Sequence, residues 1–263
     1  MNDPIPIDDR GLLLGDGLFE TLLADRGRLV WFEAHAARLV AGCAVLGLPA
    51  PTVDRLREAA ETAIAEAGLA ASRAAVRLTW TAGSGGRGLD RPPTPSPRLI
   101  AAAAPATVPS SPASLAVAAV RRNAGSPASR LKSLAYLDNL LARRDARAKG
   151  ADEAVMLNTD GHVACAAAAN LFWVREGRLF TPDLACGVLN GIARAVVIGV
   201  AAGAQVETVA VRVTPDALAG AEAVFLTNSL VGMRPVNRLD GRDLPAHALV
   251  DRLTQAVAEQ MAG

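Results

Sequence analysis

Lysine is rare in this chain, and one of the two lysines lies where a helix end does not account for it. Of the 27 basic residues only Lys132 and Lys149 are lysine. Lys149 precedes Gly150 at the end of a helical pattern, where a cation favours the helix dipole. Lys132 lies in SRLKSLAY, four residues before Tyr136, the only tyrosine. This pair suits covalent chemistry on an aldehyde cofactor whose ring hydroxyl the phenol binds, although their proximity can also be a coincidence.

Three segments carry donors that suit a phosphate group. NGIAR (190–194) opens a helical pattern, so the first backbone N–H groups of that helix can point at an anion. TNS (227–229) follows a strand-like segment and offers hydroxyl and amide donors. Arg38, on a helix near the N-terminus, adds a planar guanidinium. Each alone fits a capping or surface role equally well, but together they describe a pocket for a phosphorylated aldehyde.

The remaining chemical patterns are weak. His35, His162 and His247 show neither metal-ligand spacing nor a Ser–His–Asp arrangement, so ordinary core or surface roles are expected for them. The glycine-rich GSGGRG (83–88) is not followed by a helical pattern, which argues against a dinucleotide fingerprint. No GK[ST] sequence marks a P-loop. These observations leave Lys132 as the centre of any predicted site.

Composition narrows the class of protein. The chain has 263 residues, 51% of them hydrophobic, and a net charge of +1, which does not favour nucleic-acid binding. No apolar run is long enough to span a membrane, and the N-terminus lacks a signal-peptide pattern. Three unclustered cysteines argue against a disulfide framework or a zinc site. We therefore expect a cytoplasmic protein that needs no membrane, nucleic acid or metal.

The periodicity predicts an α+β fold in two domains, with a small N-terminal domain (1–108), a Pro/Ser linker (109–113) and a larger domain (114–263) with a mixed sheet and flanking helices. In the small domain we expect strands around a turn at 25–27, helices over 33–47 and 53–68, the second capped by Thr52, and paired strands at 74–83 and 97–105. In the large domain we expect strands at 115–122, 153–158, 162–166, 170–174, 178–182, 205–213 and 222–228, and helices over 134–150 and 190–203, after Thr214-Pro215 and from about Ala246.

Seven motifs follow one another along the chain: GDGLFET (15–21), FEAHAARL (32–39), GSGGRG, 131–158, AANLFWV (168–174), LNGIAR (189–194) and TNSLVGMRPV (227–236). Together they resemble the class IV aminotransferases, the fold-type IV enzymes that depend on pyridoxal 5′-phosphate. The resemblance implies a fold like that of D-amino acid aminotransferase, and it extends over nearly the whole chain. Within the family, three segments look most like the 4-amino-4-deoxychorismate lyases: GSGGRG, TNSLVGMRPV and NLFWV.

The resemblance also implies roles for residues. Lys132 would be the Schiff-base lysine and would move the proton at the substrate carbon. Arg38, the Ile192-Ala193 backbone and Ser229 would hold the cofactor phosphate. Family members act on small amino-acid-like substrates and are usually homodimers with the site between two domains. The implied cofactor-binding set is Arg38, Tyr136, Cys165, Asn170, Ile192, Ala193, Asn228 and Ser229.

Cys165 departs from the family pattern. Counting back from Asn170 places it where the family has a glutamate that keeps a proton on the pyridine nitrogen. A thiol, with an ordinary pKa of about 8.5, is a poor substitute for a carboxylate. Three outcomes stay open: a thiolate paired with a protonated ring, a neutral ring that is a weaker electron sink, or another group that reaches the nitrogen.

Three functions are weighed. The first is a lyase like 4-amino-4-deoxychorismate lyase, which releases pyruvate and leaves 4-aminobenzoate for folate synthesis; Arg87 on GSGGRG is the candidate for a substrate carboxylate, or a solvated turn residue. The second is an aminotransferase for D-amino acids, branched-chain amino acids or amines, which Cys165 would slow. The third is a non-catalytic binding protein, against which Lys132 argues because such a protein does not need it.

Overall fold

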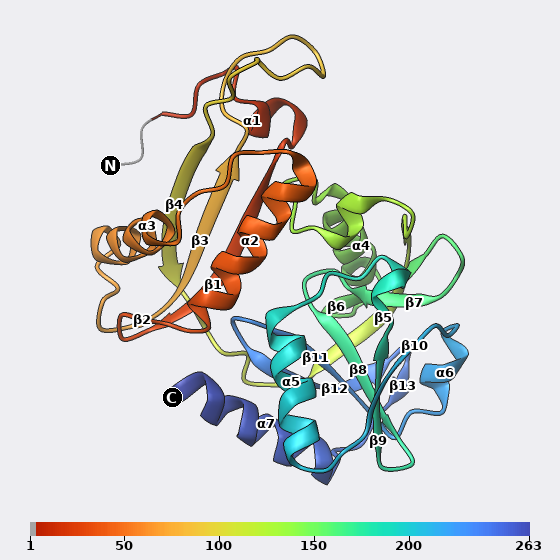
Figure 1. Cartoon of the computed structure of the whole chain (residues 1–263). Helices are drawn as coiled ribbons and strands as arrows, with labels where there is room; N and C mark the ends of the chain where they lie inside the picture. Colours follow the sequence, from red (N-terminus) through yellow and green to blue (C-terminus); the bar gives the residue numbers. More distant parts are fainter. Residues whose placement is uncertain (1–3) are drawn as a thin grey trace. The chain divides into compact units, whose positions relative to one another are not determined.

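The computed structural model describes residues 4–263 and divides into two compact units (Figure 1). Unit 1 runs to Thr107 and also takes in Leu131–Ala135. Unit 2 comprises Val108–Arg130 and Tyr136–Gly263. Unit 1 is therefore discontinuous in the sequence, and its second piece contains Lys132.

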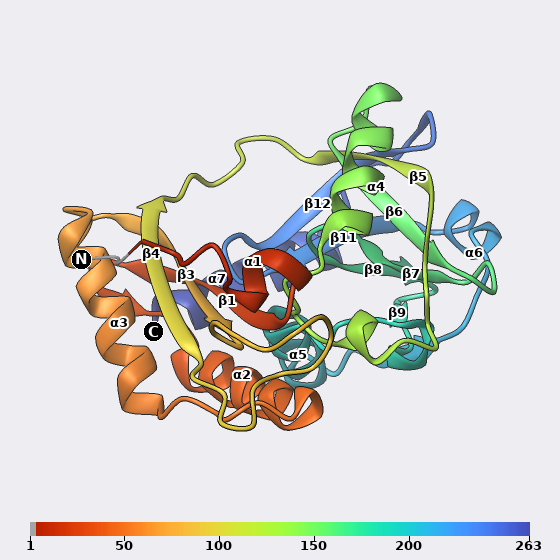
Figure 2. The same cartoon turned by 90° about the horizontal axis from the view of Figure 1, so that it is seen from above.

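Unit 1 is built on an antiparallel sheet in the order β2-β1-β3-β4. The helices α2 and α3 cover one face of this sheet, as Figures 1 and 2 show from two directions, and their apolar side chains form one core with those of β1 and β3. Thr52 caps α3 by accepting from the Arg55 N–H, and Gly47 ends α2 in the left-handed conformation, as the sequence predicts. The elements are β1 (Gly17–Asp25), β2 (Arg28–Leu29), α2 (Phe32–Leu46), α3 (Val53–Glu66), β3 (Arg73–Thr81) and β4 (Arg98–Pro105).

Unit 1 also contains one short helix that the periodicity did not predict, α1 (Arg10–Leu14). Asp9 caps it by accepting from the Gly11 N–H, and Gly15 ends it with a φ of 66°. Five residues are too few to show a hydrophobic period, so only the cap residues could have indicated this helix.

Unit 2 is built on a nine-stranded mixed sheet in the order β10-β9-β8-β11-β12-β5-β6-β7, with β13 paired to β12. The pairs β9–β10, β5–β12 and β5–β6 are parallel and the others antiparallel. All the predicted strands are present, but β12, in the interior of the sheet, was not expected. The strands are β5 (Ala113–Arg122), β6 (Glu153–Asn158), β7 (Val163–Ala166), β8 (Asn170–Arg175), β9 (Arg178–Pro182), β10 (Thr208–Val211), β11 (Ala223–Asn228), β12 (Gly232–Leu239) and β13 (Arg242–Asp243).

Four α-helices accompany the sheet within the described part of unit 2. All four begin later than predicted. The first starts at Leu137 instead of Leu134, the helix expected from 190 starts at Ile192, and the last starts at Ala248. The helix after Thr214 has only four residues, with Pro215 as its cap. Within residues 4–263 no helix has the length and apolar character that crossing a membrane requires. The helices are α4 (Leu137–Ala148), α5 (Ile192–Gly203), α6 (Asp216–Ala219) and α7 (Ala248–Ala262), and the short 3₁₀ turns are Pro127–Arg130 and Leu184–Cys186.

Candidate functional site

The segment that carries Lys132 pairs with β1 instead of starting a helix. The Phe19 N–H donates to the Lys132 carbonyl (2.8 Å), and the Leu134 N–H donates to the Gly17 carbonyl (3.1 Å). On its other side Gly17 faces β3. A Cβ atom on Gly17 would lie 2.4 Å from the Trp80 carbonyl oxygen, so the close approach of β1 and β3 requires glycine there. This pairing explains the late start of α4, and it holds the backbone of Lys132 in one place.

The Lys132 amine lies over an aromatic ring. Its Nζ is 4.2 Å from the centroid of the Phe19 ring, and the guanidinium carbon of Arg77 is 3.8 Å from the same centroid. Burial lowers the pKa of Lys132 to about 8, the charge of Glu20 acts in the opposite direction, and Arg38 and Arg77 lower it further. At pH 7 about a tenth of this lysine is therefore the neutral amine, the form that attacks a carbonyl carbon or accepts a proton, and this fraction is far larger than for an ordinary lysine.

A buried carboxylate lies beneath α2. In β1 the alternate residues Leu18, Leu22 and Ala24 face the apolar core, and Glu20 interrupts this row with a side chain only 1% exposed. Glu20 was absent from the predicted site residues. The signal that could have found it is a single acid in an otherwise apolar row of a strand.

Glu20 is hydrogen-bonded by two residues of α2. Its Oε1 accepts from Arg38 Nε (2.8 Å), and its Oε2 accepts from Arg38 Nη2 (2.6 Å) and His35 Nδ1 (2.7 Å). Burial raises the pKa of Glu20, but these hydrogen bonds outweigh burial and bring it below its usual value. Burial lowers the pKa of His35, although Glu20 acts in the opposite direction. Glu20 is therefore an anion paired with Arg38, and His35 is a neutral donor.

In unit 2 the first turn of α5 is open to an anion. Gly191 caps α5 without any side-chain hydrogen bond, and Ile192 and Ala193 follow it. Asn170 fixes the preceding loop, since its Nδ2 donates to the Leu189 carbonyl (3.0 Å). A Cβ atom on Gly191 would lie 1.9 Å from Asn170 Oδ1, so the carboxamide occupies the space that a side chain would need. The backbone donors of this turn are therefore held in place and are not capped.

The end of β11 adjoins the same region of unit 2. Thr227 lies opposite Asn170 in the β8–β11 pair, and Asn228 follows it. Asn228 Oδ1 accepts from the N–H groups of Leu230 and Val231 (3.0 Å each), which closes the turn that contains half-buried Ser229. The structure thus brings three predicted elements of unit 2 together: the Asn170 carboxamide, the Asn228-Ser229 turn and the loop before α5.

Cys165 lies in an apolar cluster. It pairs with Met156 across β6 and β7, is 6% exposed, and belongs to a core that includes Ala142 and Ala146 of α4. Burial raises the pKa of its thiol, Arg122 acts in the opposite direction, and Glu153 raises it further. The surroundings favour the neutral thiol over a thiolate.

The structure places two further predicted residues at the start of a helix and in a turn. Tyr136 is the N-cap residue of α4 and forms no side-chain capping bond. Arg87 is exposed, in a turn where Arg87 and Asp90 exchange backbone hydrogen bonds of 3.2 Å. Buried Arg10 holds this loop through the carbonyls of Leu89 and Asp90 (3.0 Å each). The Arg87 side chain is therefore displayed on an anchored loop.

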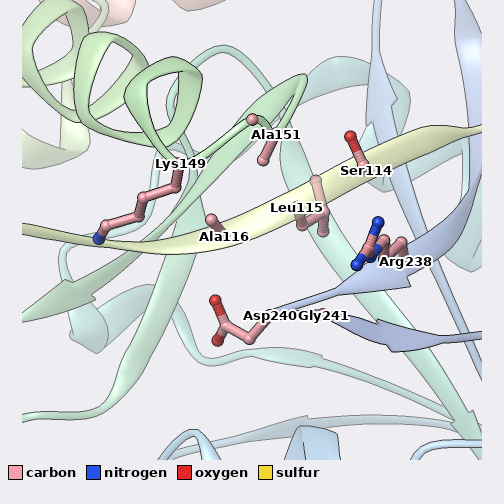
Figure 3. Close-up of a pocket in the computed structure, with 9 residues that line it drawn as sticks. Ser114, Leu115, Ala116, Lys149, Ala151, Arg238, Asp240 and Gly241 are labelled. Carbon is pink, nitrogen blue, oxygen red and sulfur yellow. The ribbon is translucent and has the colours of Figure 1, made fainter.

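A separate groove of about 460 Å³ in unit 2 contains none of the predicted residues (Figure 3). Its polar side chains bind the backbone of β5: Lys149 Nζ donates to the Val117 carbonyl (2.8 Å), and Asp240 Oδ1 accepts from the Val117 N–H (2.9 Å). These bonds satisfy β5 where its register with β6 is interrupted. Lys149 thus has a structural role here. The lining residues are Ser114, Leu115, Ala116, Lys149, Gly150, Ala151, Arg238, Asp240 and Gly241.

The donor set suits one kind of ligand. Unit 1 offers a buried amine with a lowered pKa and a guanidinium held by a carboxylate. Unit 2 offers an uncapped helix start and a turn with a hydroxyl group. Within each unit these groups suit a part of pyridoxal 5′-phosphate: an amine reacts with an aldehyde, and a guanidinium or an uncapped helix start binds a phosphate. Among residues 4–263 no group of His, Cys, Asp and Glu side chains could hold a metal ion.

Comparisons with known proteins agree with this chemistry. Residues 17–239 match the family model "Amino-transferase class IV". A Mycobacterium tuberculosis protein, "Bifunctional aminodeoxychorismate lyase / D-amino acid transaminase", is 28% identical over 95% of this chain and 91% of its own length. A Methanocaldococcus jannaschii protein, provisionally named branched-chain-amino-acid aminotransferase, is 32% identical over 90% of this chain and 83% of its own.

The fold is also that of a solved relative. A crystal structure from Legionella pneumophila, provisionally named a 4-amino-4-deoxychorismate lyase, superposes with a TM-score of 0.91 at 30% identity and covers 99% of this chain and 96% of its own. The predicted fold-type IV architecture is therefore confirmed. On the family match, the shared fold and the donor set, this chain is a member of the class IV aminotransferases, a family of pyridoxal-phosphate-dependent enzymes.

Proposed function

We propose that this chain binds pyridoxal 5′-phosphate and acts as a lyase of the 4-amino-4-deoxychorismate lyase type. The observation that carries the proposal is Lys132: an amine with a pKa of about 8, on a backbone paired to β1 and over the Phe19 ring. The lyase names of the Mycobacterium and Legionella relatives support the choice of reaction.

The residues divide the work as follows. When bound, the cofactor supplies an aldehyde that links to an amine and a ring that accepts electrons. Lys132 would hold the aldehyde carbon in the resting enzyme and would take the proton from the substrate carbon that bears the amino group. Arg38, the backbone of Ile192-Ala193 and Ser229 bind the phosphate. Arg87 is the proposed partner of a substrate carboxylate, because its guanidinium is exposed on an anchored loop.

Cys165 favours the lyase over the aminotransferase. A buried neutral thiol at this position does not replace the family's carboxylate, so the ring is a weaker electron sink. Elimination that forms an aromatic product carries its own driving force, whereas transamination depends more heavily on the ring. An aminotransferase is the second candidate, supported by the aminotransferase relative from Methanocaldococcus.

A substrate test separates the two reactions. Cofactor-loaded protein is given aminodeoxychorismate without any 2-oxo acid, and pyruvate and 4-aminobenzoate are measured. A lyase forms both products. An aminotransferase instead requires a 2-oxo acid and converts the cofactor to its amine form when given an amino donor alone. If loaded protein leaves aminodeoxychorismate unchanged, the lyase proposal fails.

The functional form is a cytoplasmic homodimer that supplies 4-aminobenzoate for folate synthesis. Large apolar side chains support a second copy as partner: Leu12 and Leu13 on α1, and Leu137 and Leu140 on α4, are each more than half exposed. The three cysteines are unpaired, as in a reducing compartment. Sedimentation of the protein and of Leu13→Glu and Leu140→Glu variants tests the dimer, since a charge in the interface shifts it toward monomer.

A further inference from the structure

We infer that Glu20 is a positioning residue for phosphate recognition: it fixes the guanidinium plane of Arg38 so that this arginine meets an anion in one orientation. The inference rests on the proposed binding of pyridoxal 5′-phosphate. It assigns a function to a residue that lies in the GDGLFET motif but was not among the predicted site residues.

The hydrogen bonds form a two-point clamp. Glu20 Oε1 accepts from Arg38 Nε and Oε2 accepts from Arg38 Nη2, at 2.8 and 2.6 Å. These donors lie on one edge of the guanidinium, so a carboxylate that binds both fixes the plane of the group as well as its position. A single hydrogen bond would leave the plane free to rotate.

His35 holds the clamp itself in place. It lies three residues before Arg38 on α2, so the two side chains share a helix face. Its Nδ1 donates to Glu20 Oε2 at 2.7 Å, which restrains the carboxylate from rotating away from Arg38. His35 Nε2 is buried and has no hydrogen-bond partner within residues 4–263. One ring nitrogen of His35 thus binds Glu20, while the other lacks a hydrogen bond. The contact made by Nδ1 is therefore the polar interaction that accounts for a histidine here.

Packing alone does not explain an acid at position 20. The neighbours of Glu20 in its strand row, Leu18 and Leu22, are apolar and buried, and a leucine at position 20 would extend their core. Buried ion pairs contribute little stability compared with apolar residues of similar volume. Arg38 is 19% exposed, so without Glu20 its guanidinium can turn toward solvent instead of remaining as a buried unpaired charge. The orientation of the Arg38 guanidinium therefore explains the charge at position 20 better than a gain in the stability of the fold does.

The test compares two ligands that differ only in the phosphate. Dissociation constants of pyridoxal 5′-phosphate and pyridoxal are measured from the absorbance of the lysine-linked form, for wild type, Glu20→Gln and Glu20→Leu. Glu33→Gln is the matched charge control, because Glu33 is an exposed acid on α2, the helix that carries Arg38. Arg38→Met sets the full contribution of the arginine. Thermal unfolding confirms that each variant is folded, and Glu20→Leu, which completes the apolar row, keeps the test valid if Glu20→Gln fails to fold.

We expect both Glu20 variants to lose about tenfold or more in affinity for the phosphate ester and less than about threefold for pyridoxal. Glu33→Gln should change neither constant. Combining Glu20→Leu with Arg38→Met should be no worse than Arg38→Met alone. Equal losses for both ligands would show that Glu20 is merely structural and would overturn the inference.

The wild-type measurements test the proposed function separately. If wild type binds neither ligand, or binds both equally, the phosphate site itself is refuted and the inference falls with it. If wild type prefers the phosphate ester and the Glu20 variants keep that preference, the cofactor proposal stands and only the role of Glu20 is lost.

Discussion

The two buried centres of this chain treat charge in opposite ways. In unit 1, Glu20 is an anion within an apolar row, and two side chains of α2 donate three hydrogen bonds to it. In unit 2, Cys165 lies among alanines, at the position where the resemblance implies an acid, and burial favours its neutral form. A buried charge persists only where a full set of partners surrounds it. In unit 1, His35 and Arg38 supply the hydrogen bonds that a buried carboxylate requires. In unit 2, the neutral thiol of Cys165 requires no such hydrogen bonds.

Lys132 gives the largest expected effect, because it is the proposed reacting group of unit 1. Lys132→Ala should lower turnover by about 10²–10⁴-fold through loss of proton transfer, and should abolish the absorbance of lysine-linked cofactor. Stopped assays and spectra measure both. Lys149→Arg is the control, since arginine keeps a cation near Asp145 and the β5 carbonyl. A variant at position 132 that retains the absorbance would mean that another amine carries the link.

The pH dependence of Lys132 sharpens the comparison. In the cofactor-free protein, acylation of Lys132 followed by mass spectrometry should rise about tenfold per pH unit up to a pH of about 8 and then level off, because the neutral amine is the reactive form. Glu20→Gln should move the midpoint lower, since the charge of Glu20 raises this pKa. A midpoint near the ordinary lysine value would contradict the description of the buried amine.

The same group links pH to stability. The folded-state pKa of Lys132 lies below its ordinary value, so the unfolded chain binds more protons between about pH 8 and 10.5. The contribution of Lys132 to the free energy of unfolding should therefore increase as the pH rises through this window. Lys132→Met, compared with wild type in urea titrations at several pH values, should remove that part of the slope.

Gly191→Ala tests the uncapped turn of unit 2 and should have an intermediate effect. The added Cβ would collide with the Asn170 carboxamide, which we expect to lower stability by about 1–3 kcal/mol and cofactor affinity by about tenfold. The backbone at Gly191 has a φ of −71°, so strain in the backbone does not complicate the result. Gly199→Ala, in the same helix and facing open space, is the control and should stabilise by up to about 1 kcal/mol. Equal behaviour of the two variants would rule out a packed carboxamide.

Cys165→Glu addresses the apolar centre and should give the smallest change in turnover. We expect transamination to rise several-fold relative to the lyase reaction, together with a loss of about 1–3 kcal/mol of stability from the buried acid. Cys165→Ser separates the effect of a carboxylate from that of simple substitution. If the ratio of the two reactions does not change in loaded Cys165→Glu, the missing carboxylate does not limit transamination.

Much of this fold could be predicted because its signals are local. Thr52 and Gly47 mark helix ends through their own capping bonds, and the alternating residues of β3 indicate a half-buried strand. The pattern of 134–150 predicted a helix from its first residue, but Leu134 instead donates to the Gly17 carbonyl. That bond joins residues far apart in the chain, so no local pattern contains it.

Part of the candidate site follows from local patterns. Asn170, Asn228 and the α5 turn were each singled out in the sequence, and they lie near one another in unit 2. Glu20 and the unusual surroundings of Cys165 were missed or left open, because burial and hydrogen-bond partners decide them. Glu20 is charged because His35 and Arg38 face it, and that depends on how α2 packs on β1. A strand pattern alone does not reveal what a helix will place over it.

The return of residues 131–135 to unit 1 bears on the order of synthesis. When the first 107 residues have left the ribosome, β1 still lacks the backbone partner that Leu131–Ala135 supplies beside Gly17 and Phe19. The backbone hydrogen bonds of Gly17 and Phe19 with this segment therefore cannot form until more than twenty further residues have emerged. Lys132, on which the proposed chemistry depends, is translated with that late segment. The chain therefore gains its proposed reactive amine and the backbone partner of Gly17 and Phe19 at the same stage of synthesis.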